Sequence, residues 1–319
     1  MFRQLLYLLS PAGERARLSV LIFHRVRAER DPLFPGDPDA TAFEALLCRL
    51  TSWCNVLPLP EAVAHLRRGA LPERSLCITF DDGYADNCTV AAPILRRLGV
   101  SATFFVATGY SSGGCMWNDK VIEAVRAATG PLLDLSDLNL GVHAVGTVED
   151  RRRAIPSLLD RLKYMPPGER ERAADAIGRR APAAHLRDLM MTREQLRELH
   201  ASGMTVGAHT VTHPILARTP DDLARKEIVE SKRVLEGQLG APVTLFAYPN
   251  GKPGRDYGAG HVAMVREAGF DAAFSTAWGV ASRTSDPLQI PRFTPWDRAP
   301  WRFGVRLAQN LRRTAYATA

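Results

Sequence analysis

The sequence predicts an α/β fold: a TIM-like, incomplete (β/α) barrel of seven or eight strand–helix units, with a helical insertion on one βα loop. Short β-rich runs alternate with helical patterns along the chain, which indicates a mostly parallel sheet. Most of these runs are apolar throughout, as expected for strands that helices cover on both faces. Polar residues with catalytic potential follow directly after several of them, and barrel active sites lie at that end of the strands.

Eight short runs are predicted as strands, and the helical patterns between them supply the crossovers. The helical pattern at 192–202 opens with a capping box, in which Gln195 follows Thr192 by three positions. Other helical patterns cover 41–53, 89–98 and 220–239. The predicted strands are residues 19–23, 56–59, 76–80, 102–106, 205–208, 244–247, 272–275 and 289–291.

The regular spacing breaks once, between residues 106 and 204, where no strand is predicted. Helical patterns occupy 117–128, 148–164 and 167–177 of this stretch. We expect a single domain over residues 1–319, with this helical insertion at about 112–190, because the stretch has no sheet and no flexible linker of its own. In a barrel such a loop shapes the substrate site, so the insertion is either a lid or structural filler.

The composition is that of a soluble globular protein. The 319 residues are 46% hydrophobic and 24% charged, close to average values, which excludes a disordered, collagen-like or multispanning membrane protein. The net charge of +7 is compatible with an anionic glycan, a lipid phosphate or a membrane surface as partner. We expect no nucleic-acid partner, because no zinc finger, basic helix or aromatic-basic ladder accompanies the charge.

A cytoplasmic location is expected. The five cysteines are odd in number and form no CxxC pair, which favours a reducing compartment. The apolar stretch at residues 5–9 is shorter than the core of a signal peptide, and no run approaches the roughly 20 apolar residues of a membrane span. The basic, amphipathic tail at 301–316 and the N-terminus predict either peripheral contact with the inner membrane face or packing against the barrel.

Two carboxylates follow one predicted strand, and two histidines follow another. Asp81, Asp82 and Gly83 come after the run at 76–80, and His209 and His213 come after the run at 205–208. Alone, each motif is also compatible with an ordinary turn. Together they place two imidazoles and a carboxylate on one rim, the composition of a catalytic Zn²⁺ or similar divalent site with open positions.

A third strand runs into the turn formed by Tyr248, Pro249, Asn250 and Gly251. This turn is either an ordinary β-turn or a loop whose backbone N–H groups face the substrate and stabilise an oxyanion.

These three elements resemble the polysaccharide deacetylase family, also called the NodB-homology or carbohydrate esterase family 4 enzymes, and in particular its exopolysaccharide-type members. Residues 79–83, Thr-Phe-Asp-Asp-Gly, match the first family motif, and residues 209–214, His-Thr-Val-Thr-His-Pro, match the second. The resemblance covers roughly residues 19–293. It implies that Asp82, His209 and His213 hold one divalent ion, zinc first, with cobalt, nickel or manganese as alternatives. It also implies that Asp81 is the general base.

The third motif departs from the family pattern, in which an arginine and an aromatic residue flank the turn. Here Ala247 replaces the arginine and Asn250 the aromatic residue. Arg292, in the last predicted strand, is a candidate for a replacement guanidinium beside the base, and a surface salt bridge is the alternative.

The general acid also departs from the family, since many members carry a late Leu-x-His and this sequence has no histidine after Gly279. His24 ends the first apolar run, in Phe23-His24-Arg25-Val26. This run looks like the Tyr-His-x-Val opening of exopolysaccharide-type members, in which that histidine is proposed as the acid. A structural role for His24 is the alternative.

Trp117 opens the insertion near the predicted rim of the barrel. Its indole is expected either to stack on a sugar ring or to anchor the start of a helix.

The function that these residues predict is metal-dependent removal of an N-acyl group, most simply N-acetyl, from an amino sugar of a polysaccharide or lipid-linked saccharide. The alternatives are a deformylase or cyclic-amide hydrolase of the same superfamily, or a catalytically idle glycan-binding protein.

Overall fold

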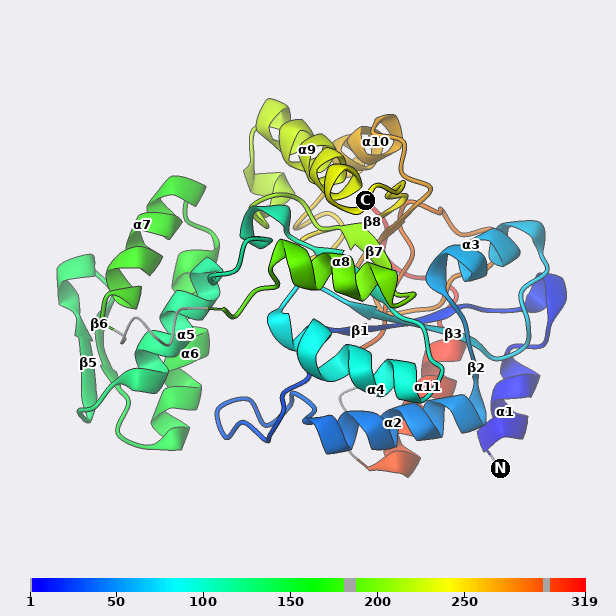
Figure 1. Ribbon diagram of the computed structural model, residues 1–319, viewed down its shortest axis with the longest axis horizontal. Coiled ribbons are helices and arrows are strands. Elements are labelled where there is room, and N and C mark those ends of the chain that lie inside the picture. Colours follow the sequence, from blue (N-terminus) through cyan, green and yellow to red (C-terminus); the bar gives the residue numbers. More distant parts are fainter. Residues whose placement is uncertain (1, 181–187, 295–298) are drawn as a thin grey trace.

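The computed structural model describes residues 2–180, 188–294 and 299–319. It places a central parallel sheet among helices, and beside it a smaller lobe that contains α5, α6 and α7 (Figure 1). Residues 181–187, at the end of the predicted insertion, lie outside the described residues.

The central sheet has seven strands, and six of them follow one path in the order β1-β3-β4-β7-β8-β9, all parallel, with β2 paired to the start of β3. This incomplete barrel confirms the predicted fold class. The strand boundaries lie within one residue of those predicted, except in β2, which ends three residues earlier than predicted, and in the last strand. The strands are β1 Ser19–Phe23, β2 Asn55–Val56, β3 Ser75–Phe80, β4 Thr103–Val106, β7 Thr205–Ala208, β8 Leu245–Ala247 and β9 Ala272–Phe274.

The predicted last strand, residues 289–291, is not a regular strand. Only isolated bridges occur here, parallel ones from Ile290 to Phe274 of β9 and from Phe293 to Leu21 of β1. The segment therefore spans the opening between the first and last strands of the path. It carries Arg292 into that opening.

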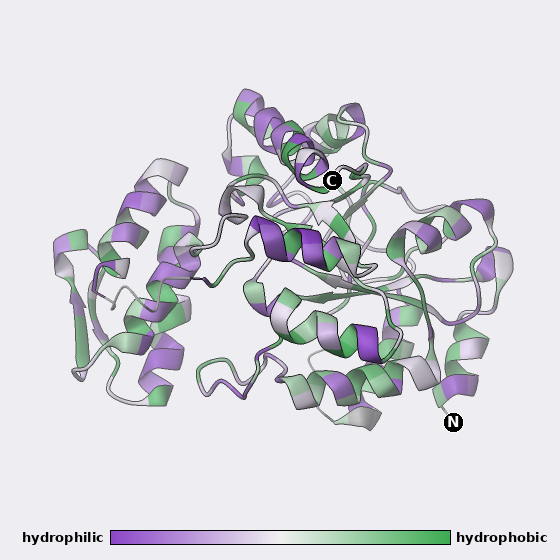
Figure 2. Ribbon diagram, in the orientation of Figure 1, coloured by the Kyte–Doolittle hydropathy of each residue, from purple (hydrophilic) through white to green (hydrophobic). Residues whose placement is uncertain are grey.

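Helices cover the sheet, which explains the apolar character of its strands: the residues of β1 and β3 are buried without exception. Figure 2 shows the strands as largely hydrophobic and the surrounding helices as mixed, with hydrophilic residues outward. The predicted capping box at Thr192 is confirmed at the start of α8. The helices outside the lobe are α1 Phe2–Leu9, α2 Ala40–Trp53, α3 Leu59–Arg68, α4 Ala92–Arg97, α8 Arg193–Ala201, α9 Asp221–Leu239, α10 Ala259–Glu267 and α11 Pro300–Leu311.

The lobe contradicts the expectation that the insertion has no sheet. Strands β5 Leu132–Leu135 and β6 Gly141–Ala144 form an antiparallel hairpin. It accompanies α5 Trp117–Ala127, α6 Val148–Lys163 and α7 Pro167–Gly178. A hydrophobic cluster runs through the lobe, separate from the two clusters that surround the central sheet. The insertion is therefore a compact α+β unit with a core of its own, and not a set of helices alone.

The C-terminal helix α11 packs on the barrel side of the molecule. Phe303, Leu307 and Leu311 are buried in the same cluster as Leu6 of α1, and the two helices contact each other. The predicted packing of this stripe is confirmed. Within the described ranges, no helix has the combination of length and apolar character needed to cross a bilayer.

Candidate active site

The two aspartates sit where β3 ends and the chain turns sharply. Asp81 donates its backbone N–H to the Phe23 carbonyl at the end of β1, at 2.9 Å. Asp82 and Gly83 follow with φ of 77° and 91°. A left-handed conformation at a non-glycine residue is uncommon and concentrates at functional sites. The turn separates the two neighbouring side chains, so that they serve different partners.

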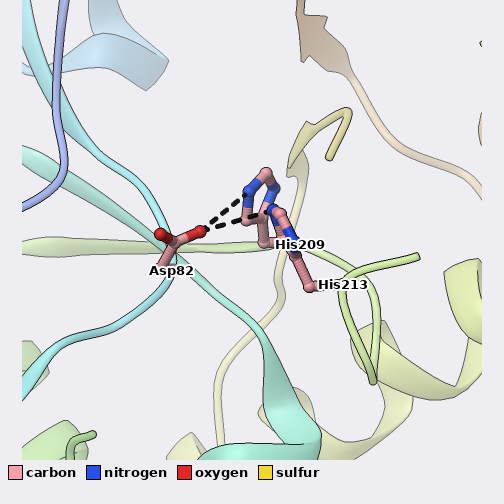
Figure 3. A group of neighbouring side chains, drawn as sticks. All are labelled: Asp82, His209 and His213. Atoms are coloured by element: carbon pink, nitrogen blue, oxygen red, sulfur yellow. Dashed lines mark ion pairs between the residues drawn. The ribbon is translucent and has the colours of Figure 1, made fainter. Parts of the chain in front are cut away.

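Asp82 faces the two histidines that follow β7 (Figure 3). Its Oδ1 lies 3.6 Å from His209 Nε2 and 3.4 Å from His213 Nε2. These separations exceed ordinary hydrogen-bond lengths, and this buried oxygen has no hydrogen-bond partner among the described residues. Three ligands held about 2.0–2.2 Å from one tetrahedral ion lie roughly 3.4 Å apart. The triad therefore fits a divalent metal ion, and the predicted grouping of these residues is confirmed.

His209 is oriented by a backbone carbonyl. Its Nδ1 lies 2.7 Å from the carbonyl oxygen of Ala247, at the end of β8. A proton on Nδ1 makes this hydrogen bond and leaves the lone pair of Nε2 directed at Asp82, the arrangement typical of metal-binding histidines. Ala247 is the residue that stands in place of the family's arginine, and it contributes here through its main chain.

His213 is positioned by a loop that a glutamate clamps. The Glu227 carboxylate on α9 accepts hydrogen bonds from the N–H groups of Val211 and Thr212, at 2.7 and 2.8 Å, and from the Thr212 hydroxyl. His213 itself has a positive φ of 53°. The loop thus turns back after His209, so that the second imidazole reaches the same point.

Asp81 borders the triad, with its Oδ2 3.8 Å from His209 Nε2, and pairs with Arg292. The guanidinium donates two hydrogen bonds to the two carboxylate oxygens, at 2.6 and 2.7 Å. In a third hydrogen bond, Arg292 Nε donates to the Ser275 carbonyl oxygen. Arg292 is 1% exposed, so the surface-salt-bridge alternative is wrong and the predicted guanidinium beside Asp81 is present. A bidentate pair of this kind fixes both the position and the orientation of the carboxylate.

The charges in the site favour a bound cation. Burial alone would raise the pKa of Asp81, but Arg292 and His209 hold it below its usual value. The pKa of Asp82 is also lowered against the effect of burial, first by His213. Burial lowers the pKa of His213 to about 4, so its imidazole is neutral near pH 7. The pKa of His209 is raised against burial, chiefly by Asp81, which means that the site stabilises positive charge at this point.

A cavity of about 370 Å³ opens above the triad. The barrel contributes one side of its lining: His24, Asp81, Asp82, His209, His213, Asn250 and Thr276. Its other wall comes from the lobe, with Trp117 of α5, Lys163 of α6 and Arg170 of α7 among the lining residues. The insertion therefore contributes part of the lining of the pocket.

His24 lines this cavity and has an exposed side chain. Its backbone carbonyl accepts a hydrogen bond from Asn87 Nδ2 at 2.9 Å. It is close enough to the triad to act electrostatically on Asp81 and Asp82. The same histidine lines a second cavity, of about 410 Å³, between the end of β1 and α2. His24 thus separates two hollows of the surface.

The third loop contributes less than the sequence predicts. The Tyr248 side chain is fully buried, stacked on Tyr257 with 3.8 Å between ring centroids, and its N–H donates to Phe274. Pro249 has no N–H, and the N–H of Gly251 donates to Pro249. Asn250 lines the cavity, and within the part of the chain that the structure describes its N–H has no acceptor. The N–H groups of Tyr248 and Gly251 thus have acceptors within the protein, and Asn250 remains the candidate donor.

Trp117 anchors the start of α5, as one of the two predicted alternatives has it, and it also lines the cavity. It is the first residue of α5 and belongs to the core of the lobe, 7% exposed. One face of its ring is covered by the Arg170 guanidinium, 5.0 Å from the ring centroid. Its edge still lines the cavity, so it anchors the helix start and also borders the pocket.

Comparison with known proteins agrees with this geometry. The sequence profile named polysaccharide deacetylase matches residues 68–132 and 170–273, just over half of the chain. The chain belongs to the polysaccharide deacetylase family. The match includes both aspartates and both histidines. It omits residues 133–169, which hold the hairpin β5–β6 and α6, and it begins after His24.

Individual relatives are distant in sequence and similar in fold. The Bacillus subtilis (strain 168) protein named "Putative polysaccharide deacetylase YxkH" is 21% identical over 87% of this chain and 71% of its own length. The Streptococcus pyogenes deacetylase PplD, solved with acetate, gives a TM-score of 0.61 at 19% identity, over 93% of this chain and 98% of that one. IcaB from Ammonifex degensii gives a TM-score of 0.59 at 19% identity, over 94% of this chain and 98% of that one.

Three features of the site could not be found by motif reading. Glu227 clamps the histidine loop, the Ala247 carbonyl orients His209, and Arg170 lines the cavity. The first two act across tertiary contacts between segments 15 or more positions apart, and the only local signal for Arg170 is its place in the insertion.

Proposed function

We propose that this chain hydrolyses an N-acyl group, most simply N-acetyl, on an amino sugar of a polysaccharide or lipid-linked saccharide, and that it needs one divalent ion. The observation that carries the proposal is the division of the two adjacent aspartates. Asp82 faces two imidazoles, and Asp81 is locked to Arg292 beside them.

Asp82, His209 and His213 would hold the ion, zinc first among the candidates because two imidazoles and one carboxylate suit it, with cobalt, nickel or manganese as alternatives. When bound, the ion supplies Lewis acidity that polarises the acyl carbonyl and acidifies water. The family membership and the buried, unpaired Asp82 oxygen support this assignment.

Asp81 is the proposed general base. Its lowered pKa keeps the carboxylate ionised near neutral pH, and Arg292 holds it in one orientation beside the triad. It takes a proton from the attacking water, while a C–O bond to the acyl carbon forms. Positioned base catalysis of this kind contributes typically 10²–10⁴-fold.

His24 is the proposed general acid. An amide nitrogen is a poor leaving group unless it is protonated, and a histidine titrates near the working pH. His24 lies on the cavity wall with Asp81 and Asp82, and its exposed ring is free to meet a substrate. It delivers a proton to the nitrogen as the C–N bond breaks, so that the products are a free amine and the carboxylic acid. The Asn250 N–H is the proposed donor to the carbonyl oxygen.

Mass spectrometry of candidate glycans tests the proposal. Oligosaccharides of N-acetylated amino sugars are incubated with protein loaded with zinc, cobalt, nickel or manganese, and with the same protein after chelation. We expect a loss of about 42 Da per acetyl group removed, only with metal and not with an Asp81→Asn variant. A loss of about 28 Da from N-formylated counterparts of these oligosaccharides, with the N-acetylated ones unchanged, would assign the deformylase alternative. Unchanged masses with every metal and substrate, together with glycan binding, would assign an idle binder.

A further inference from the structure

Arg170 is a buried cation in the wall of the active-site cavity. It lies in the first turn of α7, is 5% exposed, and lines the cavity that also contains Asp82, His209 and His213. Burial of a charged group of this kind is uncommon unless an opposite charge accompanies it.

Within the described ranges, no carboxylate forms an ion pair with Arg170, although Glu171 and Glu227 are near enough to act on it electrostatically. Among the residues that the structure describes, its guanidinium makes no hydrogen bond or ion pair, and its buried Nε has no acceptor. Its closest specific contact is the face of the Trp117 ring. Other cations of the lobe are paired: Arg126 with Asp31 and Glu123, and Lys120 with Glu171 and Asp175.

The nearby acids are already engaged elsewhere. Glu171, the next residue on α7, pairs with Lys120, and Glu227 clamps the histidine loop. Lys163 lines the same wall, and within the described ranges its ammonium has only an aromatic contact, 5.8 Å from the Tyr164 ring. One exposed acid, Asp160, also lines the cavity without an ion pair. The lobe wall therefore carries two uncompensated cations against one acid.

We propose that Arg170, assisted by Lys163, binds an anionic group of the substrate, a carboxylate or a phosphate, close to the N-acyl group that is removed. The proposal rests on the function proposed above and narrows its substrate class to acidic amino-sugar conjugates. A buried guanidinium without a partner lowers the stability of the protein, because its charge is desolvated. An oxyanion that accepts hydrogen bonds from its parallel N–H groups offsets that loss.

The size of the cavity limits where this anion sits. About 370 Å³ is near the lower end of the volumes of small-molecule sites and holds about one or two sugar units. The anion is therefore on the deacetylated sugar or on its immediate neighbour. A carboxylate points to a uronic acid in the chain, and a phosphate points to a glycosyl phosphate, as in a lipid-linked saccharide.

The experiment compares three N-acetylglucosamine ligands: the neutral tetramer, a tetrasaccharide that alternates with glucuronic acid, and the sugar 1-phosphate. Binding is measured by calorimetry without added metal, and deacetylation by acetate release with metal. The variants are Arg170→Gln and Arg170→Lys, with Arg172→Gln as the matched control, an exposed arginine two positions along the same helix.

We expect one anionic ligand to bind the wild type more tightly than the neutral tetramer. Arg170→Gln should weaken the binding of that anionic ligand about 10–100-fold, the range for hydrogen bonds to charged groups. It should change the affinity for the neutral ligand less than about 2-fold. Arg170→Lys should retain part of the preference for the anionic ligand, because lysine keeps the positive charge but lacks the paired N–H donors of a guanidinium. Arg172→Gln should behave as wild type. Whichever anionic ligand binds more tightly shows whether the site takes a carboxylate or a phosphate.

Equal losses on neutral and anionic ligands in Arg170→Gln, with Arg170→Lys no better, would overturn the proposal and assign Arg170 to support of Trp117. Wild-type protein without preference for either anionic ligand would overturn it as well. Failure of the proposed function looks different. In that case the anionic ligand binds in an Arg170-dependent manner, but no ligand loses its acyl group with any metal.

Discussion

The two walls of the active-site cavity are built in opposite ways. On the barrel wall, Asp81, His209 and Arg292 are buried and linked by hydrogen bonds to each other or to neighbouring strands. On the lobe wall, Lys163 and Arg170 have aromatic neighbours but no charged partner among the described residues. The family profile matches residues 68–132 and 170–273, which include Trp117 and Arg170 of the lobe wall as well as the aspartates and histidines of the barrel wall, and it omits Lys163.

This contrast separates chemistry from recognition. A catalytic constellation must be held to within a fraction of an ångström, and interlocked groups at the ends of parallel strands provide that rigidity. A surface that contacts variable parts of a substrate needs free polar groups instead. The barrel wall carries the groups of the proposed reaction, and the lobe wall carries the proposed anion site, so we expect substitutions on the two sides to have different effects on turnover and on binding.

The largest effect is expected on the barrel wall, from Asp81→Asn. Turnover should fall 10²–10⁴-fold, about the contribution of a positioned base, while the metal content of the protein stays at the wild-type level because Asp82 and the histidines are unchanged. Acetate release and elemental analysis of the same sample measure both quantities. Turnover near that of the wild type would place the base elsewhere.

Arg292→Gln should destabilise the fold, because it leaves the buried Asp81 carboxylate without its cation. Removal of one partner of a buried pair costs about 3–5 kcal/mol, measured as the free energy of unfolding in urea. The matched control is Arg283→Gln, which removes an exposed pair with Glu14 and should cost less than about 1 kcal/mol. A double variant with Asp81→Asn should recover part of the loss, and a strictly additive double variant would refute the coupling.

His24→Ala should discriminate between leaving groups. On amide substrates kcat should fall about 100-fold, within the usual range for a general acid. On an aryl acetate, whose leaving group needs no proton, the loss should be only a few-fold. Metal content should not change, since His24 is outside the triad. Equal losses on amide and ester would instead indicate a structural or ligand role.

The smallest effect concerns the membrane. Helices α1 and α11 contact each other and leave Leu5, Leu8, Trp301 and Val305 exposed, with Leu8 at 75% and Trp301 at 60%. Exposed apolar side chains beside a basic tail predict weak, salt-sensitive binding to anionic lipid. Flotation with anionic liposomes at low and high salt measures it, with Leu8→Ser as the comparison. Absence of binding at low salt would remove the predicted peripheral contact.

The barrel wall was predictable from sequence because its signals are local. An apolar run that ends in Asp81 and Asp82, and another that ends before His209 and His213, place four groups on one rim once the strands are parallel. Arg292 was a candidate for the same reason, although its bidentate contact with Asp81 depends on the irregular closing segment.

The lobe wall was less predictable, because its structure depends on contacts that no short motif encodes. The hairpin strands at Leu132–Leu135 and Gly141–Ala144 are short and half exposed, and their alternating burial is the one signal for them. Tyr248 reads as part of a catalytic turn, but its stacking on Tyr257 follows from the path of a distant loop. Burial of Arg170 likewise follows from how α7 packs on α5.

The most direct test of the account is anomalous scattering from crystals grown with zinc, combined with elemental analysis. We expect one ion per chain, about 2.0–2.2 Å from Asp82, His209 and His213, with Asp81 outside the coordination sphere and still paired to Arg292. Loss of the ion is expected in His213→Ala. An ion bound elsewhere, or these three side chains without a shared ion at full metal occupancy, would contradict the account.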